Sequence, residues 1–269
     1  LVQVIINTTH LEQSCHFLEE FISNITNVPP DTVNATKLYG TSTFKDARHA
    51  AEAEIYTSLN AKIDQFLQLA DYDWLAVVQG GGTLTASDYL IDLIAFLKST
   101  FSVFTNLPGT PIEHATLPGK VAQTACMSAC KHISTSLMQL LLDPEVRQIS
   151  MGALHQLNTD VKECERFARA GPVAGFQGDK LLLAFSDLRQ LLELFTQWDW
   201  STYLADYGKP TCKYLRVNPH TALALLEKMR ETSRKNNVFA QFRKTDRDRQ
   251  KLIDTVIKQL RNLITQHHT

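Results

Sequence analysis

Three side chains, Cys126, Cys130 and His132, form the one cluster in the sequence with the residue types and spacing of a metal site. In a helix the two thiols lie one turn apart and can share a zinc ion, whereas His132 points to a different face. Tetrahedral zinc would also need a fourth ligand from elsewhere in the chain. Small thiols in a helix rich in Ala and Ser are more often close-packing residues. We therefore expect no bound metal and no cofactor.

Motifs for catalysis are weak. Gly80-Gly81-Gly82 lacks the lysine, the spacing and the preceding strand of a phosphate-binding loop. Asp71 and Asp73 fall on different faces of a helix end, so they suit capping better than magnesium binding. No Gly-x-Ser-x-Gly turn that would expose a nucleophilic serine occurs in the chain. The sequence therefore favours a protein that is not an enzyme.

Residues 198–207 are rich in aromatic side chains, with large rings at Trp198, Trp200, Tyr203 and Tyr207. At a helix junction such rings fill the gap between two bundles, and we favour this interpretation. Exposed, the same rings would anchor a partner protein. The two interpretations differ in the burial of the rings.

The C-terminal region carries a charge that the average hides. The whole chain has 27 Lys and Arg against 28 Asp and Glu, but residues 225–269 hold 11 against 5, a net charge of +6, and the remainder carries −7. Aromatic, basic and amide side chains alternate within residues 227–250. This pattern fits a partner protein with an acidic rim or an anionic membrane. The pattern is weak support for binding of single-stranded nucleic acid. The near-zero net charge of the whole chain gives no general reason to expect a nucleic-acid partner.

The elements that position these residues are helices. Nearly every long segment repeats its apolar residues at intervals of three and four, and alternating strand patterns are nearly absent. Pro29-Pro30 ends the first helix. Asp143 is a candidate N-cap for the helix predicted from residue 145. We predict helices at about 2–26, 44–70, 88–104, 120–142, 145–170 and 181–198, one opening at Asn218-Pro219, and a last one beginning near Asp246.

Consecutive antiparallel helices joined by short loops make this an all-α protein. The strongest interruption is the Gly- and Pro-containing loop 171–178, so we predict an N-terminal bundle at 1–170 and a C-terminal bundle at 171–269. The 269 residues are 44% hydrophobic at a net charge of −1, which excludes a wholly disordered chain. Because the first residue is Leu1 and not Met, we expect a piece of a longer protein.

Composition also bears on the compartment. The five cysteines are an odd number and scattered, which favours a reducing environment, although Asn7, Asn24 and Asn34 match the glycosylation pattern. No stretch reaches the roughly 18 uncharged apolar residues of a membrane span. The longest candidate, 89–104, contains Asp92 and Lys98. We expect a cytoplasmic protein.

Seven stretches are distinctive: IINTTHLEQ from Ile5, STFKDARHAAEAEIY from Ser42, LADYDW from Leu69, GKVAQTACMSAC from Gly119, WDWSTYLADYG from Trp198, YLRVNP from Tyr214 and KNNVFAQFRK from Lys235. Together they resemble the C-terminal domain of the exocyst subunit family Sec-fifteen, over most of the chain. The resemblance implies an elongated, rod-like stack of helical bundles. It implies a non-enzymatic role in tethering secretory vesicles to the plasma membrane.

The resemblance also implies partners. These are a GTP-bound Rab GTPase, notably of the recycling-endosome type, other exocyst subunits such as Sec-ten, and myosin V. The implied location is the cytoplasm, with peripheral association at secretory or recycling vesicles and the plasma membrane.

An effector reads the ordered switch regions of a GTPase with apolar anchors and a polar rim. We predict such a site at the break between the last two helices, with two phenylalanines as anchors, two amides as hydrogen-bonding neighbours and two arginines that steer an acidic partner. The residues are Asn236, Asn237, Phe239, Phe242, Arg243 and Arg247. In the alternative interpretation both phenylalanines lie in the core and the amides cap a helix. The alternative function is a peripheral membrane-binding module that uses the basic C-terminal helices.

Overall fold

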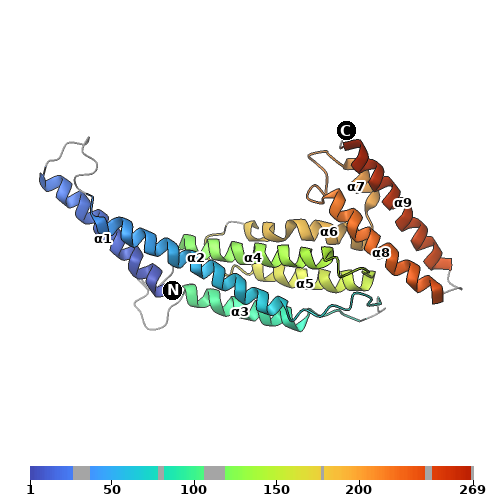
Figure 1. Ribbon diagram of the computed structural model, residues 1–269, viewed down its shortest axis with the longest axis horizontal. Coiled ribbons are helices and arrows are strands. Elements are labelled where there is room, and N and C mark those ends of the chain that lie inside the picture. Colours follow the sequence, from blue (N-terminus) through green and yellow to red (C-terminus); the bar gives the residue numbers. More distant parts are fainter. Residues whose placement is uncertain (27–36, 78–81, 106–118, 177–178, 240–243, 268–269) are drawn as a thin grey trace. The chain divides into compact units, whose positions relative to one another are not determined.

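The computed structural model describes residues 1–26, 37–77, 82–105, 119–176, 179–239 and 244–267 (Figure 1). Side chains are described in the same ranges except at residues 233–247. The described residues form helices and no strand, so the predicted all-α class is confirmed. The elements are α1 (Val2–Thr26), α2 (Tyr39–Leu67), α3 (Asp88–Thr105), α4 (Gly119–Leu142), α5 (Met151–Arg169), the 3-10 helix η1 (Lys180–Phe185), α6 (Ser186–Gln197), α7 (Trp200–Asp206), α8 (Pro219–Phe239) and α9 (Lys244–His267).

Most predicted helices are present, and the largest error concerns the start of α5. The helix predicted from residue 145 begins at Met151. Asp143, the predicted cap, instead accepts the N–H of Glu145 on its carboxylate at 2.9 Å, within the turn that precedes α5. The cap is Ser150, whose hydroxyl oxygen accepts the N–H of Ala153 at 3.1 Å. The pattern misled because apolar residues of the turn before α5 continue its spacing.

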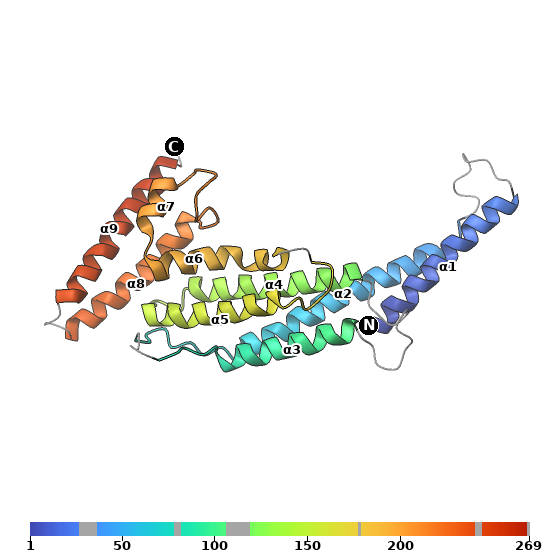
Figure 2. The same cartoon turned by 180° about the vertical axis from the view of Figure 1, so that it is seen from behind.

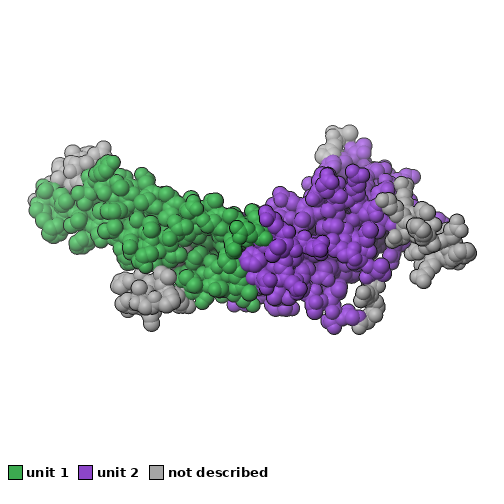
Figure 3. Space-filling view, turned by 60° about the horizontal axis from the view of Figure 1, so that its bottom comes forward, with its two compact units in different colours: residues 1–65, 95–129, 171–177 green, residues 66–94, 130–170, 178–269 purple. Residues whose placement is uncertain are grey.

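The chain forms two compact units (Figure 3). Unit 1 comprises Leu1–Gln65, Ala95–Ala129 and Gly171–Gln177, and unit 2 comprises Phe66–Ile94, Cys130–Ala170 and Gly178–Thr269. Helices α2, α3 and α4 contribute residues to both units. The boundary at 171–178 between bundles 1–170 and 171–269 stays a prediction about which parts fold independently.

In unit 1, helices α1 and α2 lie side by side (Figures 1 and 2). Arg48 Nε donates to Glu12 Oε2 at 2.9 Å. Seven residues after Glu12 on α1, Glu19 Oε1 accepts the Thr41 hydroxyl at 2.7 Å and the Leu38 N–H at 2.8 Å. These two hydrogen bonds hold the pKa of Glu19 below its usual value. Glu19 thereby fixes the start of α2. The buried apolar residues of α2 are Ala51, Ile55, Leu59 and Ile63.

Unit 2 contains a fully buried carboxylate, Asp160, in α5. Asp160 Oδ1 accepts the backbone N–H of Ser87 at 2.7 Å and the amide of Gln156 at 3.3 Å. Its Oδ2 accepts the Ser87 hydroxyl at 2.7 Å and the Tyr72 hydroxyl. The Tyr72 oxygen lies 2.5 Å from the hydroxyl of Tyr89. Several hydrogen bonds thus replace the water that this carboxylate loses on burial.

The direction of the hydrogen bonds around Asp160 follows from the tyrosines. Burial, followed by the effects of Tyr89 and Asp160, raises the pKa of Tyr72 far above its usual value. The Tyr72 hydroxyl therefore keeps its proton and donates it to the carboxylate, and Tyr89 in turn donates to the Tyr72 oxygen.

Asp160 also determines where α3 begins. Ser87 directly precedes α3, and its carbonyl accepts the N–H groups of Leu90 at 3.0 Å and Ile91 at 3.1 Å. Because Asp160 binds both the N–H and the hydroxyl of Ser87, it holds the first turn of α3 against α5.

The segment before α3 is held by the start of α5. Ser150 donates its N–H to the carbonyl of Trp74 at 2.8 Å and its hydroxyl to the carbonyl of Ala76 at 2.6 Å. At Gly152 an added Cβ would lie 2.2 Å from the Ala76 oxygen, so only glycine permits this approach.

Replacing Asp160 with Ala should lower the free energy of unfolding by about 3 kcal/mol, because buried donors on Tyr72 and Ser87 lose their acceptor. Urea unfolding followed by tryptophan fluorescence measures this, since all three tryptophans lie in unit 2. Asp254→Ala is the matched control on the exposed face of α9 and should change stability by less than about 0.5 kcal/mol. Equal effects of the two variants would contradict the role given to Asp160.

Candidate partner-binding site

The predicted partner-binding residues fall where α8 gives way to α9. Asn236, Asn237 and Phe239 lie in the last turns of α8, and Arg247 lies in the first turn of α9. Phe242 and Arg243 lie outside the described residues. Only residues 240–243 separate the two helices, so the backbone places the four described positions at one end of the pair. Their side-chain contacts stay a prediction.

Helices α8 and α9 run side by side within unit 2 (Figures 1 and 2). Each turns an apolar row inward, as their stripes predict. Arg261 on α9 donates to Glu227 on α8 at 2.6 Å. The buried rows are Ala222, Leu225, Leu226 and Met229 on α8, and Ile253, Val256, Ile257 and Leu260 on α9.

Lys228 ties α8 to the end of α4. Its ammonium group donates to the carbonyls of Leu141 and Asp143, both at 2.7 Å, and so satisfies acceptors that a helix end leaves open. The N–H of Ile149 donates to the Lys228 carbonyl at 3.4 Å. Partial burial lowers the pKa of Lys228. The α8–α9 pair is therefore anchored near the middle of α8.

The described part of α9 has a charged outer face. Its exposed side chains carry both signs but more positive than negative charge, so the positive net charge of the C-terminal region is open to solvent. The exposed charged residues are Asp248, Arg249, Lys251, Asp254, Lys258 and Arg261. Such a surface accelerates association with an acidic partner.

The aromatic segment lies in the core, as the favoured interpretation predicted. Trp200 is 3% exposed and Tyr203 is fully buried, while Trp198 and Tyr207 are half-buried. Trp200 meets Tyr203 edge to face, with ring centroids 5.9 Å apart. The Tyr203 hydroxyl donates to the Val217 carbonyl at 3.0 Å. These rings stabilise the junction of α6, α7 and the segment before α8.

Asp199 organises the polar side of this junction. Its Oδ1 accepts the hydroxyl of Thr202 at 2.7 Å and its Oδ2 accepts the hydroxyl of Tyr214 at 2.8 Å. The ammonium group of Lys213 lies 3.9 Å away. The Thr202 bond first, and then the Tyr214 bond, hold the pKa of Asp199 below its usual value.

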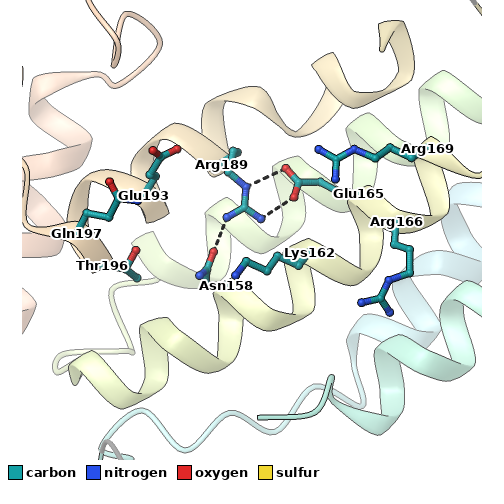
Figure 4. A pocket seen from close by; sticks show the side chains of 9 residues that line it. All are labelled: Asn158, Lys162, Glu165, Arg166, Arg169, Arg189, Glu193, Thr196 and Gln197. Carbon is teal, nitrogen blue, oxygen red and sulfur yellow. Dashed lines mark hydrogen bonds and ion pairs between the residues drawn. The ribbon is translucent and has the colours of Figure 1, made fainter. Parts of the chain in front are cut away.

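A second surface feature is an open pocket of about 570 Å³ between α5 and α6 (Figure 4). At its centre Arg189 binds Glu165 through two parallel hydrogen bonds, at 2.8 and 2.7 Å, and also donates to Asn158. Lys162 and Arg169 lie on the α5 wall, one on either side of this pair (Figure 4). The pocket is therefore polar and mostly basic.

Sequence reasoning missed this pocket. A signal exists in α5, where Lys162, Arg166 and Arg169 repeat at intervals of four and three and so share a face. Arg189 is remote in sequence and joins them only through packing. The net charge of −7 outside residues 225–269 also hid this local positive cluster.

The cysteines considered for zinc, Cys126 and Cys130, are both fully buried in α4. In the part of the chain with described positions, no three His, Cys, Asp or Glu side chains gather as metal ligands would. Burial raises the pKa of the Cys164 thiol on α5, which keeps it in the unreactive form. Nor does any helix within the described ranges have the length and apolar content needed to cross a membrane.

Comparison with known proteins gives a family. Residues 1–228 match the family model "Exocyst complex subunit Sec15 C-terminal". "Exocyst complex component 6B" of Homo sapiens is 73% identical over 269 residues, which is 100% of this chain and 32% of the relative. "Exocyst complex component 6" of Drosophila melanogaster is 38% identical over 263 residues, 98% of this chain and 32% of the relative. The chain thus spans about a third of the length of the curated relatives it matches.

Among solved structures, "Crystal Structure of Sec15 C-terminal domain" is similar, with 32% sequence identity and a TM-score of 0.47. The match covers 73% of this chain and 55% of that chain. The family-model match ends at residue 228, before the predicted partner-binding residues, whereas the match to the human relative includes them.

Replacing Asp199 with Asn should destabilise the protein most at neutral pH. Because the pKa of Asp199 is lowered by folding, its charge stabilises the fold above the unfolded value of about 3.9, and this contribution is lost as the pH falls through the folded-state pKa. Urea unfolding should therefore show a difference between wild type and variant that shrinks below about pH 4. Tyr214→Phe, which removes one donor, should reproduce part of the difference; a difference that is constant with pH would contradict this role.

Proposed function

Since the chain belongs to the family of C-terminal regions of the exocyst subunit Sec15, we propose that it is a non-enzymatic vesicle-tethering domain that binds a GTP-loaded Rab GTPase. The relatives are named as components of the exocyst complex, which supports a role inside a multi-subunit assembly. Other exocyst subunits are then its structural partners. Myosin V is a further proposed partner.

The observation that carries the Rab proposal is the construction of the α8–α9 end. Two long helices pack through buried rows and hold one short connection at their end. In the sequence, Asn236, Asn237, Phe239 and Phe242, with two arginines, fall at and beside the break between these helices. A switch region ordered by a terminal phosphate offers an apolar patch with a polar rim, which these residue types match.

Basic residues in this region would act mainly on the rate of association. Arg243 and Arg247 add to the positive charge of residues 225–269, and charges at the rim of an interface steer an acidic partner without setting most of the affinity. The affinity would come from the phenylalanines, because aromatic side chains that become buried supply most of the binding energy.

The proposed location follows from the proposed role. As part of a tethering complex, the domain would reach secretory or recycling vesicles and the plasma membrane from the cytoplasm through its partners. A second candidate function is direct peripheral binding of anionic lipid, favoured by the exposed Lys251 and Lys258 on α9. Sedimentation with phosphatidylserine vesicles separates the two, since lipid binding would persist without any Rab.

A panel of Rab GTPases, each loaded with GDP or with a non-hydrolysable GTP analogue, tests the effector role. We expect capture of the GTP form of a recycling-endosome Rab, and at least tenfold weaker capture of its GDP form, because only the GTP form orders the switch regions. Equal recovery of both forms would refute the effector role.

Within that assay Asn237→Ala should weaken capture about five- to tenfold, the effect of losing one hydrogen bond at an interface. Asn262→Ala, on the exposed face of α9, is the matched control and should leave capture unchanged. Circular dichroism should show the same helix content for both variants. Undiminished capture by Asn237→Ala would remove Asn237 from the site.

A further inference from the structure

Among the described residues, some charged side chains of the α5–α6 pocket in unit 2 are paired with other charged side chains of the protein, and others are not. Arg189 is bound to Glu165 by two hydrogen bonds, and Arg166 is paired with Glu163 on its own helix. Glu193 on the α6 wall is paired with Lys213 at 2.7 Å. These pairs cancel one another, so they contribute little net charge to the pocket.

Two cations are left over. Lys162 and Arg169 are exposed, line the pocket and have no ion-pair or hydrogen-bond partner among the described residues. They are seven residues apart on α5, which is two turns and about 10 Å along the helix axis. Figure 4 shows them on either side of the Arg189–Glu165 pair. A guanidinium group and an ammonium group at that spacing suit two separate negative charges better than one.

Polar neutral groups line the pocket on the Lys162 side (Figure 4). The amides of Asn158 and Gln197 and the hydroxyl of Thr196 line the same pocket. Such groups are suited to hydrogen bonds with a peptide backbone. The carboxylates of Glu165 and Glu193 also line it, but they are already paired with Arg189 and Lys213, so only two positive charges of the described lining residues are free to meet a ligand.

We propose that this pocket binds an acidic segment of a partner protein, with one carboxylate at Lys162 and a second at Arg169. The wide spacing of the two free cations on either side of the Arg189–Glu165 pair, and their small number, favour this ligand over a polyphosphate headgroup. The inference is independent of Rab binding, because none of the residues that carry it belongs to the α8–α9 end. The free charge stands out because the chain outside residues 225–269 is otherwise acidic, with a net charge of −7.

The test measures fluorescence anisotropy of a labelled dodecapeptide of alternating Glu and Ala, added to the complete 269-residue chain. The corresponding Gln–Ala dodecapeptide is the uncharged control probe. We expect the acidic probe to bind, its affinity to fall as salt is raised, and the uncharged probe to bind at least tenfold more weakly. Equal binding of the two probes would overturn the proposal.

The variant is the double substitution Lys162→Gln and Arg169→Gln, which should weaken binding of the acidic probe at least tenfold. Both side chains are exposed and unpaired within the described ranges, so thermal unfolding should be unchanged. The matched control is Lys45→Gln with Lys98→Gln, which removes the same charge from exposed positions on α2 and α3 that do not line the pocket. We expect it to weaken binding less than twofold.

Two results would overturn the assignment. The first is an equal loss in both double variants, because the effect would then belong to overall charge and not to the pocket. The second is that Lys162→Gln with Arg169→Gln lowers binding to phosphatidylcholine vesicles containing phosphatidylserine but leaves binding of the acidic peptide intact. That result would make the pocket a lipid site.

Discussion

Burial of the Asp160 carboxylate is the constraint on which most of unit 2 depends. An isolated charge inside a protein is strongly unfavourable, so the chain must supply hydrogen-bond donors wherever Asp160 lies. It does so with Tyr72, with the backbone and hydroxyl of Ser87, and with Gln156. Each donor comes with a piece of backbone, so satisfying one carboxylate fixes the segment around residue 72 and the start of α3 against α5. The hydrogen bonds to Asp160 thereby hold the non-helical backbone at Tyr72 and Ser87 in a defined position.

A single polar side chain also joins separate segments at the junction before α8. Asp199 accepts two hydroxyls there, and the aromatic rings of Trp200 and Tyr203 exclude water from the apolar side. Lys228 then satisfies the open carbonyls at the end of α4. In each case one polar side chain makes hydrogen bonds with backbone or hydroxyl groups of a segment distant in sequence. These contacts, with the buried apolar rows, hold the described parts of α8 and α9 within unit 2.

The proposed tethering role requires surfaces of defined chemistry that stable packing holds in place. The two proposed surfaces differ in that chemistry: the sequence around the α8–α9 break holds phenylalanines, asparagines and arginines, and the α5–α6 pocket holds two separated cations around a neutralised ion pair. Surfaces so different are suited to different partners, which is consistent with a member of a multi-subunit complex.

The sequence by itself determined that the protein is helical and where most helices lie, because a period of 3.6 residues with one apolar stripe is a local property. It also predicted that α8 starts at Asn218-Pro219 and that the aromatic segment fills a junction. It could not place the start of α5, because the turn after Asp143 continues the apolar spacing and only the contacts of Ser150 with Trp74 and Ala76 decide the boundary.

The tertiary structure alone decided which distant side chains meet. Asp160 stands within the apolar stripe of α5, between Leu157 and Cys164, and this could have marked it as a buried polar residue, but not which donors would satisfy it. Arg189 likewise joins Lys162 and Arg169 only because α6 packs on α5. The physical reason is that the spacing of nearby residues determines which side chains share a helix face. Which faces pack together depends on the free energy of folding the whole chain.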